Sequence, residues 1–222
     1  MNVIITGTSR GIGLELTKQS LEKGYMTLAV ARKSTHSDAL LKLGEQYKNI
    51  FQFLDLDVSL EQKIPAIAKA VESWKSVDVL INNAGMYAKG DSQEDFLKSF
   101  TVNTIAPYLV TKALLPKLQQ SSQPKVVQIS SLMGSVADTS GGAVVYRSSK
   151  AALNMVNKVI SGDHSFLTAI VMHPGWVKTD MGGSTAPVEI PDSAKGIWTV
   201  ITKLKHDDTG KFFNFRGENL PW

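Results

Sequence analysis

Short apolar runs rich in β-branched residues alternate along the chain with longer segments of helical periodicity, and this order limits the possible folds. The runs predict strands at residues 3–6, 27–31, 50–55, 77–81, 125–130, 166–173 and 211–215. The segments between them predict helices at residues 13–22, 38–47, 60–73, 96–118 and 145–160, with a bend or an end near Pro116. Such alternation is typical of parallel βαβ units. The expected fold class is α/β: a doubly wound, mainly parallel sheet of about seven strands with helices on both faces.

Length and composition set further limits. The chain has 222 residues, 43% of them hydrophobic, and no repeat or low-complexity linker divides it. We therefore expect residues 1–222 to form one domain. The sequence has no cysteine and its four histidines are widely spaced, so neither a disulfide framework nor a metal site is expected.

The charge pattern and the hydropathy pattern argue against nucleic acid and membranes as partners. The 24 Lys and Arg residues are scattered among 20 Asp and Glu residues, which favours a solvated surface over a nucleic-acid interface. No apolar run approaches the ~18 residues that a membrane helix needs, and the first residues enter a strand without a basic leader. A cytoplasmic protein that binds neither nucleic acid nor membrane is expected.

A glycine-rich loop follows the first predicted strand directly. It reads Thr6-Gly7-Thr8-Ser9-Arg10-Gly11-Ile12-Gly13. Glycines let the backbone turn sharply and approach a pyrophosphate, while the helix that follows offers free N–H groups and a positive dipole end. An ordinary glycine-rich turn is the alternative. The place of the loop, at the first strand–helix junction, favours a dinucleotide site made by Gly7, Ser9, Arg10, Gly11, Ile12 and Gly13.

The second predicted strand ends at Arg32 and Lys33. A carboxylate at this place holds the ribose 2′-OH of NAD, whereas a cation suits the 2′-phosphate of NADP. Arg10, in the glycine loop, is placed to clasp the same phosphate. Either arginine alone is typical of an ordinary surface. The two together, with no carboxylate at the strand end, favour NADP(H) as the cofactor.

Four more segments follow later strands or open the last predicted helix. They are Asn82-Asn83-Ala84-Gly85, Ser130-Ser131, Tyr146-Arg147-Ser148-Ser149-Lys150 and Pro174-Gly175-Trp176-Val177-Lys178-Thr179. With the TGxxxGxG spacing of the glycine loop, they resemble the short-chain dehydrogenase/reductase family over essentially the whole chain. The YRSSKAALN run from Tyr146 and the HPGWVKTDMGG run from His173 resemble its branch of Sniffer-type carbonyl reductases and bacterial C-factor. So do the Ser-Gly-Gly stretch at residues 140–142 and the ending from Asn214 to Trp222. The resemblance implies a Rossmann-type fold.

Tyr146 and Lys150 are four residues apart in a predicted helix, so they share one face. A phenol with a pKa of about 10 is a poor acid at neutral pH, but a nearby ammonium favours its ionised form. Lowering this pKa to about 7 takes roughly 4 kcal/mol, which Lys150 and the positive charge of the cofactor are expected to supply in a dry site. A surface pair of tyrosine and lysine is the alternative, and the partner motifs disfavour it.

The family resemblance implies a reaction. Hydride passes from the nicotinamide to the carbonyl carbon of a small-molecule substrate, an aldehyde, ketone or quinone, and Tyr146 protonates the alkoxide as general acid. Ser131 hydrogen-bonds the carbonyl oxygen as charge develops. Lys150 also bonds the nicotinamide ribose, and Asn103 holds a water that passes protons onward. The implied enzyme is an NADP-dependent oxidoreductase of carbonyl reductase type.

The choice between two adjacent serines rests on the resemblance. Ser130 and Ser131 point to opposite faces of an extended strand, so physical reasoning alone leaves both open. Aligning the next three residues with the family pattern assigns Ser131 as the catalytic serine. Its separation from Tyr146 is longer than usual, which predicts a different connecting loop.

The remaining cofactor contacts follow from the same resemblance. Asp57 and Val58 flank the adenine after the third strand, although Asp57 alone is equally typical of a helix cap. The other contacts are Asn83, Ala84 and Gly85 at the adenosine ribose, and Pro174, Gly175, Val177 and Thr179 at the carboxamide.

Two other functions are alternatives to a carbonyl reductase. An NADP(H)-binding signalling or sensor protein of C-factor type keeps the fold and makes catalysis secondary. An epimerase or dehydratase of the longer-chained branch is disfavoured by the glycine-loop spacing and by the lack of a C-terminal substrate domain. Substrate identity is not predicted, but the short segment at 179–194 indicates an open pocket, with Trp176, Met133, Met181 and Tyr87 as wall residues or as ordinary packing.

The helices predicted at residues 96–118 and 145–160 carry more apolar residues than one core face needs, including Leu109, Leu114, Ala152 and Met155. Members of the resembled family commonly pair through these two helices in an isologous contact. A homodimer or homotetramer is expected.

Overall fold

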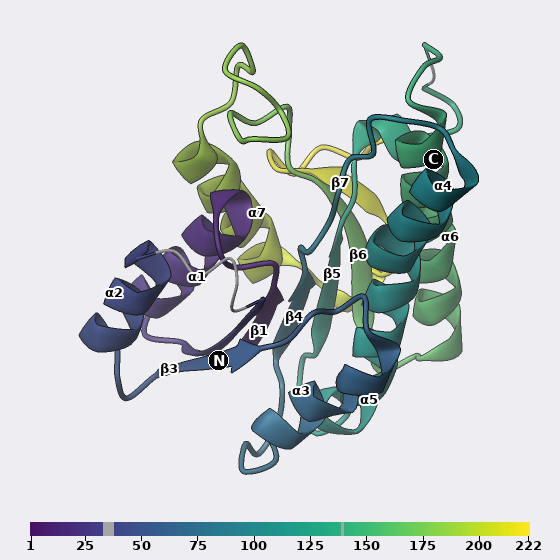
Figure 1. Ribbon diagram of the computed structural model, residues 1–222. Coiled ribbons are helices and arrows are strands. Elements are labelled where there is room, and N and C mark those ends of the chain that lie inside the picture. The colour runs from purple at the N-terminus through teal and green to yellow at the C-terminus, as the bar shows by residue number, and fades with distance from the viewer. Residues whose placement is uncertain (33–37, 139) are drawn as a thin grey trace.

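The computed structural model describes residues 1–32, 38–138 and 140–222, and its centre is a seven-stranded parallel sheet (Figure 1). The strands are β1 (Asn2–Thr6), β2 (Met26–Ala31), β3 (Phe51–Asp55), β4 (Val79–Asn82), β5 (Lys125–Ile129), β6 (Thr168–His173) and β7 (Phe212–Asn214). Their order across the sheet is β3-β2-β1-β4-β5-β6-β7, and every neighbouring pair is parallel. The predicted α/β class is confirmed, and so are the seven predicted strands, with slightly shifted ends.

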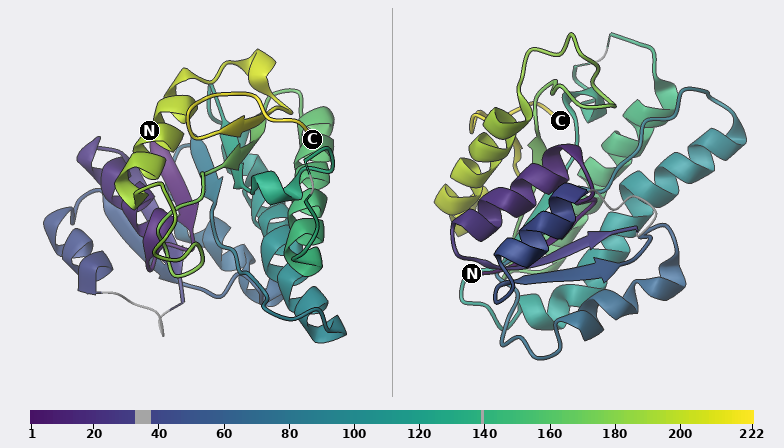
Figure 2. Two further views of the ribbon diagram at one scale, coloured as in Figure 1. Left: turned by 90° about the horizontal axis from the view of Figure 1, so that it is seen from above. Right: turned by 60° about the vertical axis from the view of Figure 1, so that its left-hand side comes forward.

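Helices cover both faces of the sheet (Figures 1 and 2). One face carries α1 (Gly11–Glu22), α2 (Asp38–Gln46) and α7 (Ile190–Lys203). The other carries α3 (Pro65–Ala70), α4 (Gln93–Phe100), α5 (Ala106–Leu118) and α6 (Val144–Asp163). Because both faces are covered, the central strands are buried at nearly every position, which explains their uninterrupted apolar sequences.

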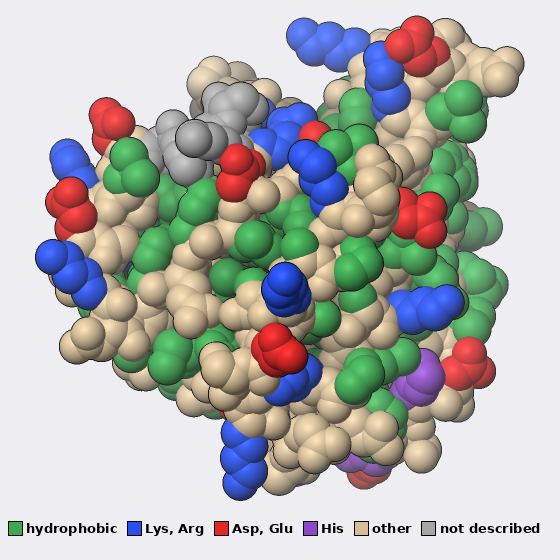
Figure 3. Space-filling view, turned by 60° about the horizontal axis from the view of Figure 1, so that its bottom comes forward, with side chains coloured by type: hydrophobic (Ala, Val, Ile, Leu, Met, Phe, Trp, Pro, Cys, Tyr) green, Lys and Arg blue, Asp and Glu red, His purple; other side chains and the backbone are tan. Residues whose placement is uncertain are grey.

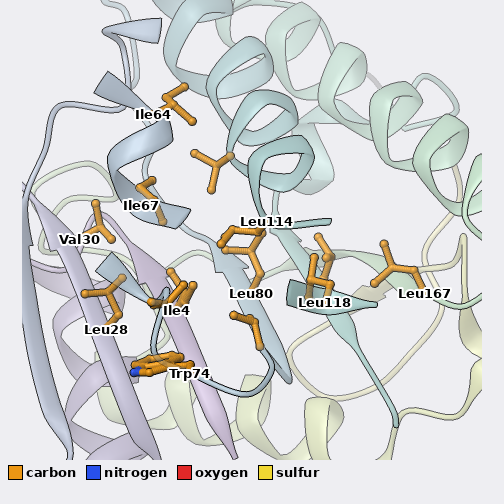
Figure 4. Packing of buried hydrophobic residues seen from close by; sticks show 14 of the residues in the cluster. Ile4, Leu28, Val30, Ile64, Ile67, Trp74, Leu80, Leu114, Leu118 and Leu167 are labelled. Atoms are coloured by element: carbon orange, nitrogen blue, oxygen red, sulfur yellow. The ribbon is translucent and has the colours of Figure 1, made fainter. Parts of the chain in front are cut away.

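The core divides into two clusters because successive side chains of a strand point to opposite faces. Ile4 packs with Leu114 of α5 on one face (Figure 4). Its neighbour Val3 packs on the other face, in the cluster that contains Trp198 of α7. The buried indole of Trp198 donates to the Leu16 carbonyl at 3.1 Å and so joins α7 to α1. Each fully buried aliphatic side chain contributes ~1.5–3 kcal/mol to folding.

The sequence prediction misses helix α7. Its apolar residues Ala194, Ile197 and Ile201 have helical spacing, and Pro191 occupies a first-turn position that suits proline. These signals are present in the sequence. The segment before them is rich in Gly, Ser and Pro and is typical of a loop, and the prediction extended this loop over the start of the helix. The helix matters for function because its first residue, Ile190, lies at the cleft described below.

The predicted helix at 60–73 is wrong in its extent. The structure has a short 3₁₀ turn (Glu61–Lys63) followed by α3, which is only six residues long. Pro65 lacks the N–H that would continue the first turn, so the helix starts again with proline in its first position.

The predicted helix at 96–118 contains an irregular turn. Between α4 and α5 lies a π-helical turn (Thr101–Ile105), in which the Ala106 N–H donates to the Thr101 carbonyl. This wider turn precedes Pro107, whose ring would clash with the carbonyl four residues back in a regular α-helix. The predicted end near Pro116 is confirmed, because α5 ends at Leu118.

The apolar residues of α5 and α6 that were predicted to exceed the needs of the core differ in exposure. Leu114 is wholly buried in the core of the chain, so its place on an outer surface is wrong. Leu109 packs against the same core, and Ala152 is partly buried. Met155 is 64% exposed and remains available on α6.

Positive and negative side chains are interspersed over the face of the molecule shown in Figure 3. Within the described ranges, no helix combines the length and the apolar character that crossing a membrane requires.

The strand order reverses beside β1. The chain moves outward from β1 to β2 and β3, and then returns to place β4 on the other side of β1. In open parallel sheets, ligands bind at such a reversal, beyond the carboxyl ends of the strands. The glycine loop leaves the carboxyl end of β1, so it lies at this point.

Candidate active site

A cleft of about 860 Å³ opens at the carboxyl ends of the strands and reaches from the glycine loop to α6. Most of the predicted site residues line it: Gly7, Ser9, Arg10, Gly11, Ile12, Gly13, Arg32, Asp57, Val58, Asn83, Ala84, Gly85, Tyr146, Lys150, Pro174 and Thr179. Four predicted residues in the described part of the chain are not among those that line it: Asn103, Ser131, Gly175 and Val177.

The glycine loop is packed too closely for larger residues. A Cβ on Gly13 would lie 2.2 Å from the Gly7 carbonyl oxygen and 2.4 Å from the side-chain nitrogen of Asn83. Gly7 itself has a φ of +72°, in the region that glycine adopts without strain. The Asn83 amide donates to the carbonyls of Thr6 at 3.0 Å and Gly7 at 3.1 Å. The Asn83 segment is thus fastened to the glycine loop.

The first residues of α1 leave room for an anion. Arg10 precedes the helix, and its side chain makes no capping hydrogen bond to the first turn. The first backbone N–H groups of a helix have no partner within the helix and carry a partial positive charge. The close-packed glycines, the cleft and this helix end therefore fit the pyrophosphate of a dinucleotide.

Adding a methyl group at Gly13 should damage both the fold and the site. We expect Gly13→Ala to lower Tm and to weaken NADPH binding, because Gly7 or Asn83 must move to relieve the overlap. Gly162→Ala is the matched control, since a Cβ at that helical position meets nothing within 4 Å. There we expect unchanged binding and a slight rise in stability, up to ~1 kcal/mol. Thermal unfolding and fluorescence titration measure both, and equal behaviour of the two variants would contradict this account.

The two arginines predicted to bind the 2′-phosphate lie in different ion pairs. Arg32 Nη1 is 3.8 Å from the Asp57 carboxylate. Arg10 Nε is 3.3 Å from the carboxylate of Asp180 in the loop after β6, and both side chains are largely exposed. Both arginines line the cleft. Lys33, the other cation of the prediction, lies outside the described residues.

Of the two alternatives for Asp57, the helix cap is wrong, because the N-cap of the next 3₁₀ turn is Leu60. The contact of Asp57 with the adenine stays a prediction. The Asp57 carboxylate accepts hydrogen bonds from the Ser59 N–H at 2.9 Å and the Ser59 hydroxyl at 2.7 Å. It also lines the cleft and pairs with Arg32. Burial raises the pKa of Asp57, but the hydrogen bonds from Ser59 and the charges of Arg32 and Lys63 lower it below its usual value. The group is therefore a carboxylate at neutral pH, and it holds Arg32 at the cleft.

Tyr146 is a buried phenol that hydrogen-bonds the hydroxyl of Ser131. Burial raises the pKa of Tyr146 to about 12; the hydrogen bond from Ser131 opposes this rise and the nearby Tyr87 adds to it. The predicted lowering of the Tyr146 pKa by Lys150 is not found in the structure of the chain alone. The Lys150 Nζ lies 5.8 Å from the Tyr146 ring centroid and donates instead to the Ile129 carbonyl at 2.9 Å.

Lys150 is also buried, and burial lowers its pKa to about 8. Its Nζ approaches the backbone at Gly85, where a Cβ would lie 3.6 Å from it. The Asn83–Gly85 segment and the α6 helix therefore meet at this ammonium group. At neutral pH Tyr146 is a phenol and Lys150 carries a positive charge, which are the ionisation states that a proton donor and its cationic neighbour require.

The two candidate serines have different partners. The Ser130 hydroxyl is buried and donates to the side-chain oxygen of Asn154 at 2.7 Å. Ser131 faces Tyr146, and its oxygen accepts the Met133 N–H at 3.2 Å. Ser130 lines the cleft and Ser131 does not, whereas Ser131 is the serine beside Tyr146, so the choice of Ser131 stays a prediction from the family pattern.

Asn103 lies in the π-helical turn and is buried behind the cleft. Its side-chain oxygen accepts the Met86 N–H at 2.8 Å, and its amide donates to the Met86 carbonyl at 2.9 Å. The same amide donates to the Ser149 hydroxyl at 3.0 Å. Asn103 thus fastens the loop after β4 to α6, and its water-holding role stays a prediction.

Only part of the predicted set in the loop after β6 lines the cleft. Pro174 and Thr179 line it, while the Val177 side chain is buried and Gly175 packs against the Phe215 ring with a φ of +90°. The sequence interpretation missed several lining residues: Val102, Lys178, Asp180, Ser184 and Ile190. Lys178 and Asp180 stand inside the quoted motif and carry charge, so the motif itself held a signal for them.

A doubly wound parallel sheet, with a cleft that joins a glycine-rich loop after the first strand to a buried Ser, Tyr and Lys, defines a dinucleotide-dependent oxidoreductase. Residues 1–189 match the short chain dehydrogenase family, and the chain belongs to this family. The resemblance predicted from the motifs is thereby confirmed.

Three known proteins are similar to this chain. The C-signal of Myxococcus xanthus is 46% identical over 155 residues, which cover 66% of this chain and 93% of the relative. The structure of carbonyl reductase Sniffer of D. melanogaster matches with a TM-score of 0.95 at 31% identity, over 100% of this chain and 99% of the other. An NADPH-bound carbonyl reductase from chicken fatty liver matches with a TM-score of 0.93 at 31% identity, over 100% and 98% of the two chains.

Proposed function

We propose that this oxidoreductase is an NADPH-dependent carbonyl reductase, which converts an aldehyde, ketone or quinone to an alcohol. The observation that carries the proposal is that Tyr146 and Lys150 line one end of the cleft, with Ser131 beside Tyr146, while the glycine loop and Arg32 line the other end. The similarity to Sniffer and to the NADPH-bound chicken enzyme supports the same reaction class.

The residues of the cleft fit NADP(H) in a defined direction. The glycine loop would hold the pyrophosphate, Arg32 and Arg10 the 2′-phosphate, and Asp57 with Val58 the adenine. The remaining predicted contacts are Asn83, Ala84 and Gly85 at the ribose, and Pro174, Gly175, Val177 and Thr179 at the carboxamide. The reduced cofactor supplies the hydride when it is bound.

The chain itself supplies the proton and the electrostatic support. Tyr146 is a phenol at neutral pH and so carries the proton that a reacting carbonyl oxygen needs. Burial raises its pKa and makes it a weaker acid, and the nearby Lys150 ammonium would oppose this effect as the phenolate forms. The Ser131 hydroxyl lies against the Tyr146 hydroxyl, where it can bond the same oxygen as negative charge develops. The Lys150 ammonium, held by the Ile129 carbonyl, stabilises the phenolate that remains after proton transfer.

The direct test is a survey of substrates. The purified protein is mixed with NADPH and each of a panel of aliphatic aldehydes, aromatic ketones, diketones and quinones, and loss of the NADPH absorbance is followed. We expect turnover with at least one class and identify the alcohol by mass spectrometry. Absence of NADPH binding, or of oxidation across the whole panel, would overturn the proposal.

The pH profile of the reaction should have a basic limb set by Lys150. Its pKa of about 8 means that the ammonium is charged below this pH and increasingly neutral above it. We therefore expect kcat/KM for NADPH, which reports groups of the free enzyme, to fall by about tenfold per pH unit on the basic side. Tyr146, with a pKa of about 12, titrates too high to produce this limb. A profile that stays flat up to a pH of about 10 would exclude Lys150 as its source.

A signalling or sensor function is the second candidate. The observation that favours it is the 46% identity to the C-signal of Myxococcus xanthus. In this case NADP(H) binding matters and catalysis is secondary. Variants that bind NADPH without turnover separate the two functions, because only the signalling function survives in them.

We also propose that two copies pair through α5 and α6. Met155 and Val159 stand four residues apart on α6 and are 64% and 52% exposed, an arrangement that leaves an apolar stripe in water. We expect Met155→Glu to convert a dimer or tetramer to a smaller species in light scattering at micromolar concentration. Leu41→Glu on α2, where Leu41 is also exposed, is the control and should leave the assembly unchanged. A monomeric wild-type protein would contradict the proposal.

A further inference from the structure

Arg147 follows Tyr146 on α6, and its side chain spans the segment that separates Ser131 from Tyr146. Its Nη1 donates to the Met133 carbonyl at 3.3 Å, and its Nη2 donates to the Ser140 hydroxyl at 3.1 Å. Its Nε donates to the carbonyls of Gly141 and Gly142, each at 3.1 Å. One guanidinium group therefore bonds both ends of the same segment.

The N-terminal side of this segment leads directly to Ser131. The Met133 N–H donates to the Ser131 hydroxyl oxygen at 3.2 Å, and the carbonyl of the same residue accepts from Arg147. Ser131 precedes a short 3₁₀ turn (Leu132–Gly134) and is its N-cap. Arg147 thus reaches the residue whose N–H orients the Ser131 hydroxyl.

The C-terminal side of the segment has an unusual backbone. Gly141, Gly142 and Ala143 have φ angles of +83°, +70° and +48°, so three successive residues are left-handed just before α6 begins. A Cβ on either glycine would meet nothing within 4 Å. Glycine has more backbone conformations open to it than any other residue. The bonds from Arg147 select one of them and thereby fix the start of the helix that carries Tyr146.

We propose that Arg147 is a positioning residue for carbonyl reduction: it holds the segments on both sides of the reacting carbonyl, so that Ser131 and Tyr146 keep their mutual distance. Arginine suits this task because its planar group presents five N–H donors in a fixed fork and stays charged at every working pH. Arg147 is not among the residues that line the cofactor cleft, so its effect is separate from cofactor binding. The inference rests on the proposed reductase function.

Arg147→Met keeps most of the aliphatic stem and removes every donor. We expect kcat to fall by about tenfold and KM for the carbonyl to rise, because catalytic groups lose their alignment. The Kd of NADPH, measured by fluorescence, should stay unchanged. Arg216→Met is the matched control: Arg216 is exposed and stacks on Phe215, and its loss should leave kcat unchanged. Wild-type kcat and KM in Arg147→Met would overturn the proposal.

A double-mutant cycle separates positioning from general stability. If Arg147 keeps the distance between Ser131 and Tyr146, then Arg147→Met should slow the Ser131→Ala variant by a clearly smaller factor than it slows the wild type. Losses that multiply would show that Arg147 acts elsewhere and would overturn the proposal. Should Arg147→Met fail to fold, Ser140→Ala, which removes one acceptor, should give a smaller loss of kcat in the same direction; no loss would count against the proposal.

Failure of the proposed reductase function is distinguishable from failure of this inference. Wild-type turnover across the substrate panel tests the function, whereas the ratio of variant to wild type tests Arg147. Amide hydrogen exchange over residues 140–143 needs no turnover. Faster exchange in Arg147→Met than in wild type would support the holding role, and equal exchange would overturn it.

Discussion

Replacing Tyr146 with Phe should lower kcat for carbonyl reduction by about two orders of magnitude or more while leaving NADPH binding nearly intact. Phenylalanine keeps the buried ring and its packing against Tyr87, whose ring centroid is 5.0 Å away. It loses only the hydroxyl that bonds Ser131 and that we expect to protonate the alkoxide. Steady-state kinetics with the best substrate of the panel and fluorescence titration of NADPH measure the two effects separately.

Tyr87→Phe is the matched control for this variant. It removes a hydroxyl from the neighbouring ring, which is 42% exposed and lies beside Tyr146. We expect Tyr87→Phe to keep kcat within about threefold of wild type, since no proton transfer depends on it. Near-normal turnover in Tyr146→Phe would remove Tyr146 from the role of proton donor, whatever Tyr87→Phe does.

The fold and the main outline of the site could be predicted because their signals are local. Apolar runs at strand length, the glycine loop at the first junction and the four-residue spacing of Tyr146 and Lys150 each lie within a few residues of sequence. Local patterns of this kind determine backbone conformation and which side chains share a face. The structure accordingly brings Gly7, Gly13, Tyr146 and Lys150 to one cleft.

The properties that the sequence did not predict depend on segments that meet only in the folded chain. Burial dominates the pKa of Tyr146, and burial follows from how α6 packs against the loop after β4. Arg10 pairs with Asp180, and Arg147 bonds carbonyls of the Ser-Gly-Gly stretch, contacts that neither motif indicates by itself. Leu114 was assigned to an outer surface because helical periodicity does not say which of two apolar stripes the sheet covers.

The ion pair between Arg32 and Asp57 has a consequence for cofactor choice. In the chain alone Asp57 neutralises part of the charge that a 2′-phosphate would meet, at a separation of 3.8 Å. The pair is largely solvent-exposed on the arginine side, so its own contribution to stability is at most ~1 kcal/mol. A phosphate with nearly two negative charges can therefore compete with Asp57 for Arg32, and substitution of Arg32 should leave the fold intact.

Arg32→Asp should reverse or abolish the preference for NADPH over NADH. A charge-assisted hydrogen bond is worth about 1.5–3 kcal/mol, so Arg32 with Arg10 supports a preference of about a hundredfold or more. The substitution removes that attraction and places a second carboxylate beside Asp57, which repels the 2′-phosphate. The measurement is the ratio of kcat/KM with NADPH to kcat/KM with NADH, in wild type, in Arg32→Asp and in the neutral control Arg32→Gln. We expect the ratio to fall from wild type to Arg32→Gln and further to Arg32→Asp. A wild-type ratio near one, or a ratio that Arg32→Asp leaves unchanged, would mean that the 2′-phosphate binds elsewhere in the cleft.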